Sequence, residues 1–293
     1  MIAIDWGTSN FRAFRLNDAG EILERRSYPS GVLRVEEGRF AEALVEQVGD
    51  WLTMGENRIL LCGMVGSRQG WTEAKYLSCP VGLADLASSV IRLPFDGAEV
   101  LLIPGVIGED PYGVPEVMRG EETEAMGMSI GSEGAALVCM PGTHSKWIHL
   151  ENRTIVSFIT CMTGEVFSAL RKGTILARIM TSDTTVDETA FLRGVARSAD
   201  NGGLLHHLFS VRTLALMDQL KEEDSASYLS GLLIGHEVRA AMPPGSHVHL
   251  IGATHLCTLY AQAIEACGGS STLEDQDAAA RGLAAIARRL SWT

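Results

Sequence analysis

Hydrophobic and polar residues alternate along the chain in short runs that predict a mixed α/β fold. Apolar residues lead into Asp5, a polar segment follows, and alternation resumes over 11–16, which predicts two strands joined by a tight turn. A third short strand is expected over 21–27, and a helix over 40–52, where apolar residues recur at helical spacing. The apolar run 58–62 is short enough for a buried parallel strand. The predicted order therefore begins β-β-β-α-β.

The same layout recurs in the second half of the chain. A strand, a glycine- and hydroxyl-rich turn, two more strands and a helix are expected over 135–140, 141–146, 147–150, 154–160 and 164–170. The halves share this layout without sharing sequence. We therefore predict an α/β protein of two lobes with related topology, residues 1–131 and 132–293, which meet near 131–134.

The remaining segments complete these lobes. Helices are expected over 83–93, 121–130, most of 189–238, 253–264 and 277–290, and strands over 99–103, 247–252 and 271–273. The glycine-punctuated loop 63–71 follows an apolar strand, at the sheet edge where α/β proteins bind ligands.

Composition and charge narrow the function classes. With 293 residues, 46% hydrophobic and 20% charged, the chain is long enough for a packed core. A net charge of −12 and the lack of a Lys/Arg-rich run argue against nucleic acid and anionic membranes as partners. No signal-peptide pattern or membrane-spanning apolar stretch is visible, and the six cysteines form no Cys-x-x-Cys pair. We expect a cytoplasmic protein.

The first polar turn carries groups that suit a phosphate and a metal ion. Gly7 lets the backbone approach a ligand closely, and the hydroxyls of Thr8 and Ser9 can hold phosphate oxygens. Asp5, at the end of a buried strand, is a candidate to hold a hydrated Mg²⁺. All these residues are also turn formers, so an ordinary hairpin is the alternative.

Two later turns have related chemistry. The turn after the strand at 135–140 combines a flexible backbone, two hydroxyls and a cation in Gly142, Thr143, His144, Ser145 and Lys146. Phosphoryl transfer depends on positioning and charge neutralisation, which such groups supply. Further on, Gly252 and Thr254 stand at a strand-to-helix junction, where a flat ring or a phosphate can approach a helix N-terminus.

Together, the three turns resemble those of the sugar kinases that share a fold with actin, Hsp70 and hexokinase. In that superfamily an N-terminal Asp-x-Gly-Thr turn serves phosphate and metal, a second turn opens the second lobe, and a C-terminal glycine motif takes the adenosine. The resemblance implies ribonuclease H-like (actin-like ATPase) lobes with a cleft between them, and ATP and Mg²⁺ as cofactors. Pro141 stands where the second turn of the superfamily commonly has an acid, so no base or metal ligand is placed there.

More narrowly, nearly the whole chain resembles the 2-dehydro-3-deoxygalactonokinase family. The motifs that carry this resemblance are 5–8 (DWGT), 63–71 (GMVGSRQGW), 118–123 (MRGEET), 141–147 (PGTHSKW), 162–165 (MTGE), 209–213 (FSVRT) and 227–235 (SYLSGLLIG). The resemblance implies ATP-dependent phosphorylation of the 6-hydroxyl of a 2-keto-3-deoxy aldonic acid in galactonate breakdown.

A general base and a partner for the substrate carboxylate follow from this resemblance. Related sugar kinases carry the base at the entrance of the last helix of the first lobe, which is occupied here by Glu121 and Glu122. Helix-terminal acids favoured by the macrodipole are the alternative for this pair. Glu165 and Asp5 are further candidates for the base.

An arginine is expected to bind the substrate carboxylate, because a guanidinium pairs with a carboxylate through two hydrogen bonds. Arg68 is the first candidate, and Arg119 and Arg212 are the alternatives. The loop at Ser30 and Gly31 is expected to reach the sugar.

Two other function classes remain as alternatives. An actin-like or Hsp70-like ATPase that switches protein contacts would need subdomains for which 293 residues leave little room. A sugar-responsive repressor would carry a helix-turn-helix ahead of the first turn, whereas the first strand is expected to start at Ile2. The leading interpretation keeps a small-molecule sugar acid and ATP as partners, with a homodimer through the apolar helices of the second half.

Overall fold

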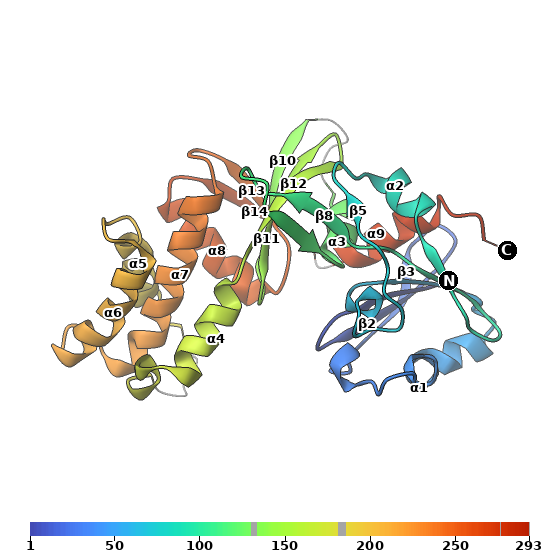
Figure 1. Ribbon diagram of the computed structural model, residues 1–293, viewed down its shortest axis with the longest axis horizontal. Helices are drawn as coiled ribbons and strands as arrows, with labels where there is room; N and C mark the ends of the chain where they lie inside the picture. Colours follow the sequence, from blue (N-terminus) through green and yellow to red (C-terminus); the bar gives the residue numbers. More distant parts are fainter. Residues whose placement is uncertain (130–133, 181–185, 276, 293) are drawn as a thin grey trace. The chain divides into compact units, whose positions relative to one another are not determined.

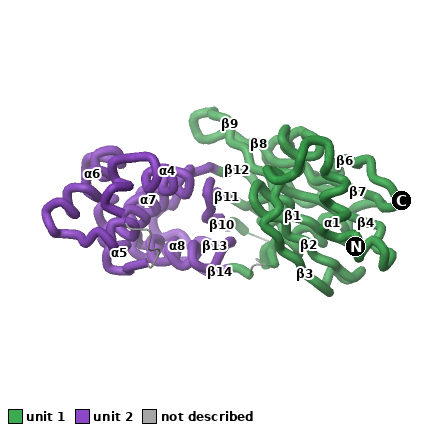
Figure 2. The backbone as a smooth tube through the Cα atoms, turned by 90° about the horizontal axis from the view of Figure 1, so that it is seen from below, with its two compact units in different colours: residues 1–135, 148–158, 274–293 green, residues 136–147, 159–273 purple. Residues whose placement is uncertain are grey.

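The computed structural model describes residues 1–129, 134–180, 186–275 and 277–292, and it has a mixed α/β fold (Figure 1). Two compact units are distinguished in Figure 2: unit 1 comprises residues 1–135, 148–158 and 274–293, and unit 2 comprises residues 136–147 and 159–273. The C-terminal segment therefore belongs to the same unit as the N-terminal segment. The expected lobes, residues 1–131 and 132–293, place it in the second lobe instead. The expected boundary between residues 131 and 132 lies outside the described residues.

Unit 1 contains a six-stranded sheet in the order β3-β2-β1-β4-β7-β6. Its strands are β1 (Ile2–Trp6), β2 (Phe11–Leu16), β3 (Ile22–Tyr28), β4 (Arg58–Cys62), β6 (Ile91–Leu93) and β7 (Glu99–Leu102). β1 pairs antiparallel with β2 and parallel with β4. This register places Asp5 directly between Arg12 and Cys62, so the last residues of the central strands meet at one sheet edge.

Helices bury the apolar positions of this sheet. They are α1 (Phe40–Thr53), α2 (Leu83–Ser88), α3 (Glu121–Met126) and α9 (Ala278–Ala287). The core gathers Trp6 and Phe11 from the sheet with Phe40, Leu44 and Trp51 from α1, at the helical spacing that the sequence indicates. The prediction of one helix over 83–93 is wrong in part: α2 ends at Ser88, and the branched residue Ile91 begins edge strand β6.

A small sheet that the sequence pattern did not indicate also belongs to unit 1. It has the order β5-β8-β9, with β5 (Leu77–Ser78), β8 (Val106–Glu109) and β9 (Pro115–Met118). These strands are too short for periodicity to separate them from loop. β9 ends at Met118 and leads directly into Gly120 and α3.

Another sheet, of five strands, repeats the strand order of the first five strands of the six-stranded sheet. Its order is β12-β11-β10-β13-β14, from β10 (Ala135–Met140), β11 (Ser145–Glu151), β12 (Thr154–Cys161), β13 (His247–Leu250) and β14 (Ser270–Leu273). β13 pairs parallel with β10 and β14, as β4 does with β1 and β7. The predicted recurrence of one layout is therefore confirmed, and in both sheets a polar turn leaves the end of the central strand.

In the described part of unit 2, α-helices cover much of the chain. They are α4 (Thr163–Gly173), α5 (Glu188–Arg197), α6 (Gly203–Leu216), α7 (Ser225–Ala241) and α8 (Thr254–Ala266). The long helix α7 is buried along most of its length, as the apolar run at 229–234 predicts. It contacts α4, α5, α6 and α8, so it is the central helix of the unit.

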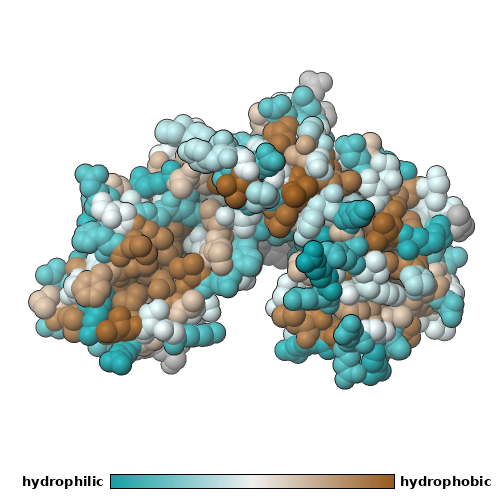
Figure 3. Space-filling view, in the orientation of Figure 1, coloured by the Kyte–Doolittle hydropathy of each residue, from teal (hydrophilic) through white to brown (hydrophobic). Residues whose placement is uncertain are grey.

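Exposed apolar side chains occur on unit 2. Figure 3 shows apolar residues gathered in the region of α5, α6 and α7, and on α6 the side chains of Leu205 and Phe209 are exposed. The homodimer expected through the apolar helices of this half stays a prediction. Within the described part of the chain, no helix is long and apolar enough to cross a membrane.

Glycines allow two close helix crossings, one in each unit. In unit 1 a Cβ on Gly282 of α9 would stand 1.9 Å from the carbonyl oxygen of Thr123 in α3. In unit 2 a Cβ on Gly231 of α7 would stand 1.9 Å from the carbonyl oxygen of Phe191 in α5. Arg281 also donates from Nε to the carbonyl of Gly127 at 2.8 Å, which fixes α9 beside the end of α3.

We predict that Gly282→Ala lowers the free energy of unfolding by about 3 kcal/mol, because the methyl group forces α9 away from α3 in a close-packed core. Thermal unfolding followed by circular dichroism measures this loss. Gly173→Ala, at a helix end where a Cβ meets nothing within 4 Å, is the matched control and should change stability little. Equal melting temperatures for Gly282→Ala and the wild type would show that the crossing does not need glycine.

Candidate functional site

Asp5 lies at the end of central strand β1 and is held by an arginine. The Arg12 guanidinium, opposite Asp5 in the β1–β2 register, donates from Nε to Asp5 Oδ2 at 2.8 Å, and its Nη2 also contacts that oxygen. Nη2 further donates to Glu124 Oε1 of α3 at 2.5 Å. The two carboxylates raise the pKa of Arg12, with Asp5 as the largest cause. The carboxylate of Asp5 therefore has a fixed orientation.

The second oxygen of Asp5 faces a corner built from two glycines. A Cβ on Gly63, which follows β4 with φ of 92°, would lie 2.9 Å from Asp5 Oδ1. Gly120, which precedes α3 with φ of 112°, lies beside Gly63: its Cβ would stand 3.2 Å from Gly63 Cα and 3.9 Å from the same oxygen of Asp5. Both conformations favour glycine, so the backbone can come this close to Oδ1 only with glycine at these positions.

The first turn is fixed by the segment after β3. Gly7 N–H donates to Asn10 O at 2.9 Å, and Gly31 N–H donates to Ser9 O at 3.0 Å. A Cβ on Gly31 would stand 2.3 Å from Thr8 O, so only glycine packs here. Gly31 thus supports the turn, while Thr8 and Ser9 themselves remain exposed at the surface of unit 1.

Ser30, the other residue predicted near the sugar, lies next to this turn. Its carbonyl accepts a hydrogen bond from Trp6 Nε1 at 3.1 Å. Its Oγ is buried without a hydrogen-bond partner in the described part of the chain.

The two candidate bases on α3 occupy different environments. Glu121 is half-buried, and its Oε2 accepts the backbone N–H of Arg119 at 3.0 Å. Glu122 is fully buried and accepts from Gly120 N–H at 2.7 Å and from Thr123 Oγ1 at 3.0 Å. Burial, followed by the charge of Glu121, raises the pKa of Glu122 to about 8. A carboxyl group that is closed off from solvent and protonated at pH 7 suits structural support of Gly120 rather than proton abstraction.

Of the three arginines predicted for the substrate, Arg212 is partly buried on α6 of unit 2, and Arg68 and Arg119 of unit 1 differ from each other. Arg68 is 86% exposed and donates from Nε to Glu73 at 2.8 Å. Arg119 is buried, donates to the carbonyl of Ala74 at 2.8 Å and lies over the Tyr76 ring at 4.3 Å. Arg119 thereby anchors the loop that carries Arg68, and of these two arginines Arg68 is the one that presents its guanidinium to solvent.

The second turn, at the end of β10, packs on the start of α4. Glu165 N–H donates to Thr143 O at 3.0 Å, and the Glu165 carboxylate contacts His144 Nε2 at 2.5 Å. Gly142, Thr143 and His144 are at least partly exposed, whereas Ser145 and Lys146 are buried. Lys146 Nζ donates to the carbonyl of His144 at 3.3 Å.

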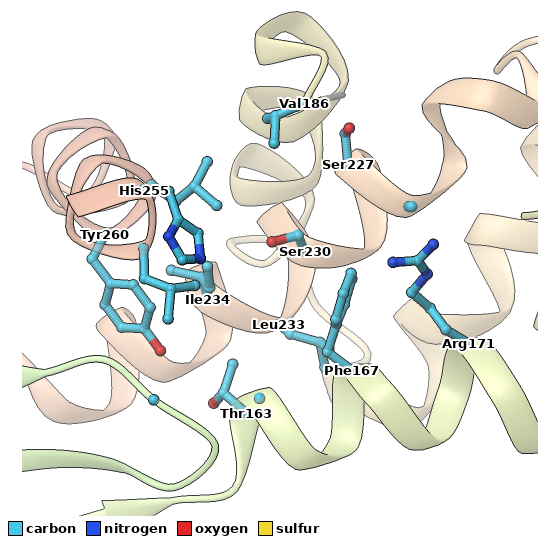
Figure 4. Close-up of a pocket in the computed structure, with 15 residues that line it drawn as sticks. Thr163, Phe167, Arg171, Val186, Ser227, Ser230, Leu233, Ile234, His255 and Tyr260 are labelled. Carbon is cyan, nitrogen blue, oxygen red and sulfur yellow. The ribbon is translucent and has the colours of Figure 1, made fainter. Parts of the chain in front are cut away.

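A pocket of about 260 Å³ adjoins this turn within unit 2 (Figure 4). Its wall is largely apolar, with Phe167 of α4 and Leu233 and Ile234 of α7. Hydroxyl groups, an imidazole and a guanidinium enter it from Thr163, Ser227, Ser230, Tyr260, His255 and Arg171. Gly142 also lines it, so the pocket extends to the second turn. The third predicted motif lies at its edge, because Gly252 precedes α8, which begins at Thr254 and supplies His255 and Tyr260.

Comparisons with known proteins place this arrangement in a family. The model of the 2-keto-3-deoxy-galactonokinase family matches residues 5–286. The chain belongs to the 2-keto-3-deoxy-galactonokinase family. It is 36% identical to a 2-dehydro-3-deoxygalactonokinase of Rhizobium meliloti (98% of this chain, 96% of the relative). It is 34% identical to the 2-dehydro-3-deoxygalactonokinase of Escherichia coli K12, over 99% and 98% of the two chains.

Solved structures agree with this membership. A crystal structure of a 2-dehydro-3-deoxygalactonokinase protein from Sinorhizobium meliloti has a TM-score of 0.89 and 36% identity, over 98% of both chains. An N-acetylglucosamine kinase structure from Porphyromonas gingivalis has a TM-score of 0.54 at 14% identity over 98% of both chains, a likeness of fold alone. The predicted actin-like kinase fold is confirmed, and the chain is a phosphotransferase with an alcohol acceptor.

Several residues of the candidate kinase sites escaped the sequence interpretation, among them the pocket residues Phe167, His255 and Tyr260. Arg12 and Glu124 orient Asp5, and Glu237 lies behind the second turn. Arg12 is the first polar position in the alternation of β2, and the pairing of β2 with β1 places it directly opposite Asp5. Glu124 and Glu237 are distant in sequence from their partners, and only the folded chain brings them together.

We predict that Glu122→Gln changes the pH dependence of stability. Because the folded chain holds the proton of Glu122 more tightly than an ordinary carboxyl with pKa 4.5, wild-type stability falls as the pH rises from about 5 to about 8. The glutamine variant lacks this penalty, so its free energy of unfolding relative to wild type should rise across that range by at most about 1.4 kcal/mol per pH unit. Thermal unfolding at each pH measures the change as a rise in the melting temperature of the variant relative to wild type. Exposed Glu109→Gln is the control, and parallel curves for wild type and Glu122→Gln would contradict the assignment.

Proposed function

We propose that this kinase transfers the terminal phosphoryl group of ATP to the 6-hydroxyl of 2-dehydro-3-deoxy-D-galactonate, in galactonate breakdown. The observation that carries the proposal is the family match over residues 5–286, together with two full-length relatives named for this substrate. An acidic chain without a basic run suits a small anionic substrate that is bound through local groups, and a cytoplasmic setting supplies the ATP.

The nucleotide is assigned to the turns and the unit 2 pocket. The apolar wall around Phe167 and Ile234 accommodates the adenine ring, with Gly252 and Thr254 at the start of α8 beside it. Within unit 2, the exposed groups of Gly142, Thr143 and His144, supported by Ser145 and Lys146, are assigned to phosphate oxygens. Within unit 1, Thr8 and Ser9 with the Gly7 backbone offer the same kind of groups to a phosphate.

Asp5 fits a hydrated Mg²⁺ that is bound with the phosphates. Its Oδ2 is occupied by Arg12, while Oδ1 faces the Gly63–Gly120 corner, where no side chain intervenes. In the described ranges no group of three or more His, Cys, Asp or Glu side chains could hold a metal by itself. This agrees with Mg²⁺, which keeps several waters and uses one or two carboxylates plus phosphates. When bound, the ion neutralises charge on the phosphates.

Glu121 is the proposed general base. In the transfer, the 6-hydroxyl oxygen forms a bond to the γ-phosphorus, the bond from γ-phosphorus to the bridging oxygen breaks, and ADP leaves. The hydroxyl proton passes to the Glu121 carboxylate. Glu121 is preferred to Glu122 because Glu122 is fully buried and carries its own proton at pH 7.

The substrate carboxylate is assigned to Arg68. Its exposed guanidinium can exchange Glu73 for the substrate with little desolvation, because an exposed ion pair is weak. Arg119 holds the loop of Arg68 in place through Ala74 and Tyr76, and Ser30 and Gly31 form the edge next to the first turn.

A coupled ATP-consumption assay against keto-deoxy sugar acids and plain aldoses tests the proposed function. We expect the highest kcat/KM for 2-dehydro-3-deoxy-D-galactonate and little turnover of aldoses, which lack the carboxylate. Preference for an aldose would overturn both the substrate and the arginine assignment. Preference for the gluconate-derived keto-acid would overturn the stereochemistry alone.

We predict that Glu121→Gln lowers kcat by about 10²-fold or more while the KM for the sugar acid changes little, because general base catalysis contributes roughly 10²–10⁴-fold. Steady-state kinetics with both substrates measures this. Glu109→Gln, an exposed acid on β8, is the control. A Glu121→Gln variant whose KM rises at unchanged kcat would make Glu121 a binding residue and leave the base elsewhere.

A further inference from the structure

A buried carboxylate lies directly behind the second turn, and the proposed chemistry does not use it. Glu237 of α7 is 5% exposed and does not line the pocket. Its Oε1 accepts from Trp147 Nε1 at 2.8 Å, and its Oε2 accepts from the Tyr260 hydroxyl at 2.7 Å. Burying an acid costs free energy unless its oxygens accept hydrogen bonds. We therefore asked what the groups that donate to Glu237 have in common.

The partners of Glu237 come from the second turn, from β11, and from α4 and α8, which line the pocket. Ser145 belongs to the second turn and Trp147 to β11, whereas Thr163 at the start of α4 and Tyr260 of α8 line the pocket. Ser145 Oγ is 3.4 Å from Glu237 Oε2, and a hydrogen bond from Thr163 lowers the pKa of Glu237 against the larger effect of burial. Figure 4 shows the hydroxyls of Thr163 and Tyr260 at the same end of the pocket.

The direction of these hydrogen bonds shows how the group is ordered. The indole N–H of Trp147 can only donate, so Glu237 must accept from it. Tyr260 donates its proton to Glu237, which leaves the Tyr260 oxygen to accept from Ser145 Oγ at 2.8 Å. Ser145 is fully buried, so its hydroxyl points inward to this relay rather than outward to a phosphate.

We propose that Glu237 is a positioning residue that locks the second turn to the wall of the nucleotide pocket. Through Ser145 it fixes the turn, and through Tyr260 and Thr163 it fixes the pocket, so a nucleotide meets both at a constant spacing. This inference rests on the proposed function, because it assumes that the pocket and the turn bind one nucleotide. We expect this order to strengthen binding of the phosphate groups more than binding of the adenine base, because the preformed turn is assigned to the phosphates.

The test compares binding of ADP and of adenosine, measured by titration calorimetry, in the wild type and in Glu237→Leu. Leucine leaves Trp147 and Tyr260 without an acceptor, and losing hydrogen bonds to a buried charged group costs on the order of tenfold in affinity. We expect ADP to bind about tenfold more weakly and adenosine to weaken much less, so that the affinity ratio of ADP to adenosine falls. A role in stability alone would leave this ratio unchanged.

Three further variants keep the test decisive. The amide of Glu237→Gln can still accept from Trp147 and donate to Tyr260, and Tyr260 can then donate to Ser145. This variant should therefore restore most of the wild-type ADP-to-adenosine affinity ratio. Ser145→Ala cuts only the link to the turn, and it should lower the ratio even where Glu237→Leu does not fold. Glu99→Leu removes another buried acid, the partner of Arg92 in unit 1, and should keep the ratio of wild type.

The outcomes separate the two proposals. If the wild type binds ADP, and both Glu237→Leu and Ser145→Ala keep its ADP-to-adenosine ratio, the positioning role is overturned while the proposed function stands. If the wild type binds no ADP at all, the proposed function fails and the inference fails with it.

Discussion

The fixed carboxylate of Asp5 is the constraint on which the rest of the candidate site depends. Strand β1 is buried between β2 and β4, so its final acid can emerge only at the sheet edge, where Arg12 pairs with one of its oxygens. Next to the other oxygen stand two glycines, at positions where the Cβ of any other residue would lie 2.9 Å and 3.9 Å from it. Charge compensation by Arg12, whose guanidinium is also held by Glu124, thus allows an acid to sit at the end of an apolar strand with a defined orientation.

In the second sheet, too, a polar network holds the turn at the end of the central strand, but the residues differ. Its central strand, β10, also ends in a polar turn, but Pro141 replaces an acid there, and the buried carboxylate is supplied from behind by Glu237. In both units a polar network that is distant in sequence therefore sets the orientation of a short, exposed turn. Rigid support of this kind matters for phosphoryl transfer, which depends on placing charge-neutralising groups rather than on covalent chemistry by the protein.

Much of this architecture follows from local sequence. Apolar runs and the polar turns between them predicted most strands of the two larger sheets, but not β6 or the small β5-β8-β9 sheet, whose strands are too short to show a period. The sequence did not predict the polar groups that support the two turns, because the partners are far apart in the chain: Arg12 and Glu124 are separated by 112 residues, and Trp147 and Glu237 by 90. The contrast between Glu121 and Glu122 was also out of reach: both are acids at a helix start, and only packing shows that one is buried and the other half-exposed.

Replacing Asp5 with asparagine tests the central claim most directly, because the amide keeps the shape of the side chain and removes only its charge. We expect kcat with ATP, Mg²⁺ and the sugar acid to fall by about 10²-fold or more, the order found when one electrostatic group is removed from an active site. The KM for the sugar acid should stay near that of wild type. Turnover close to that of wild type would contradict the account, since it would remove Asp5 from the site around which both the metal and the first turn are assigned.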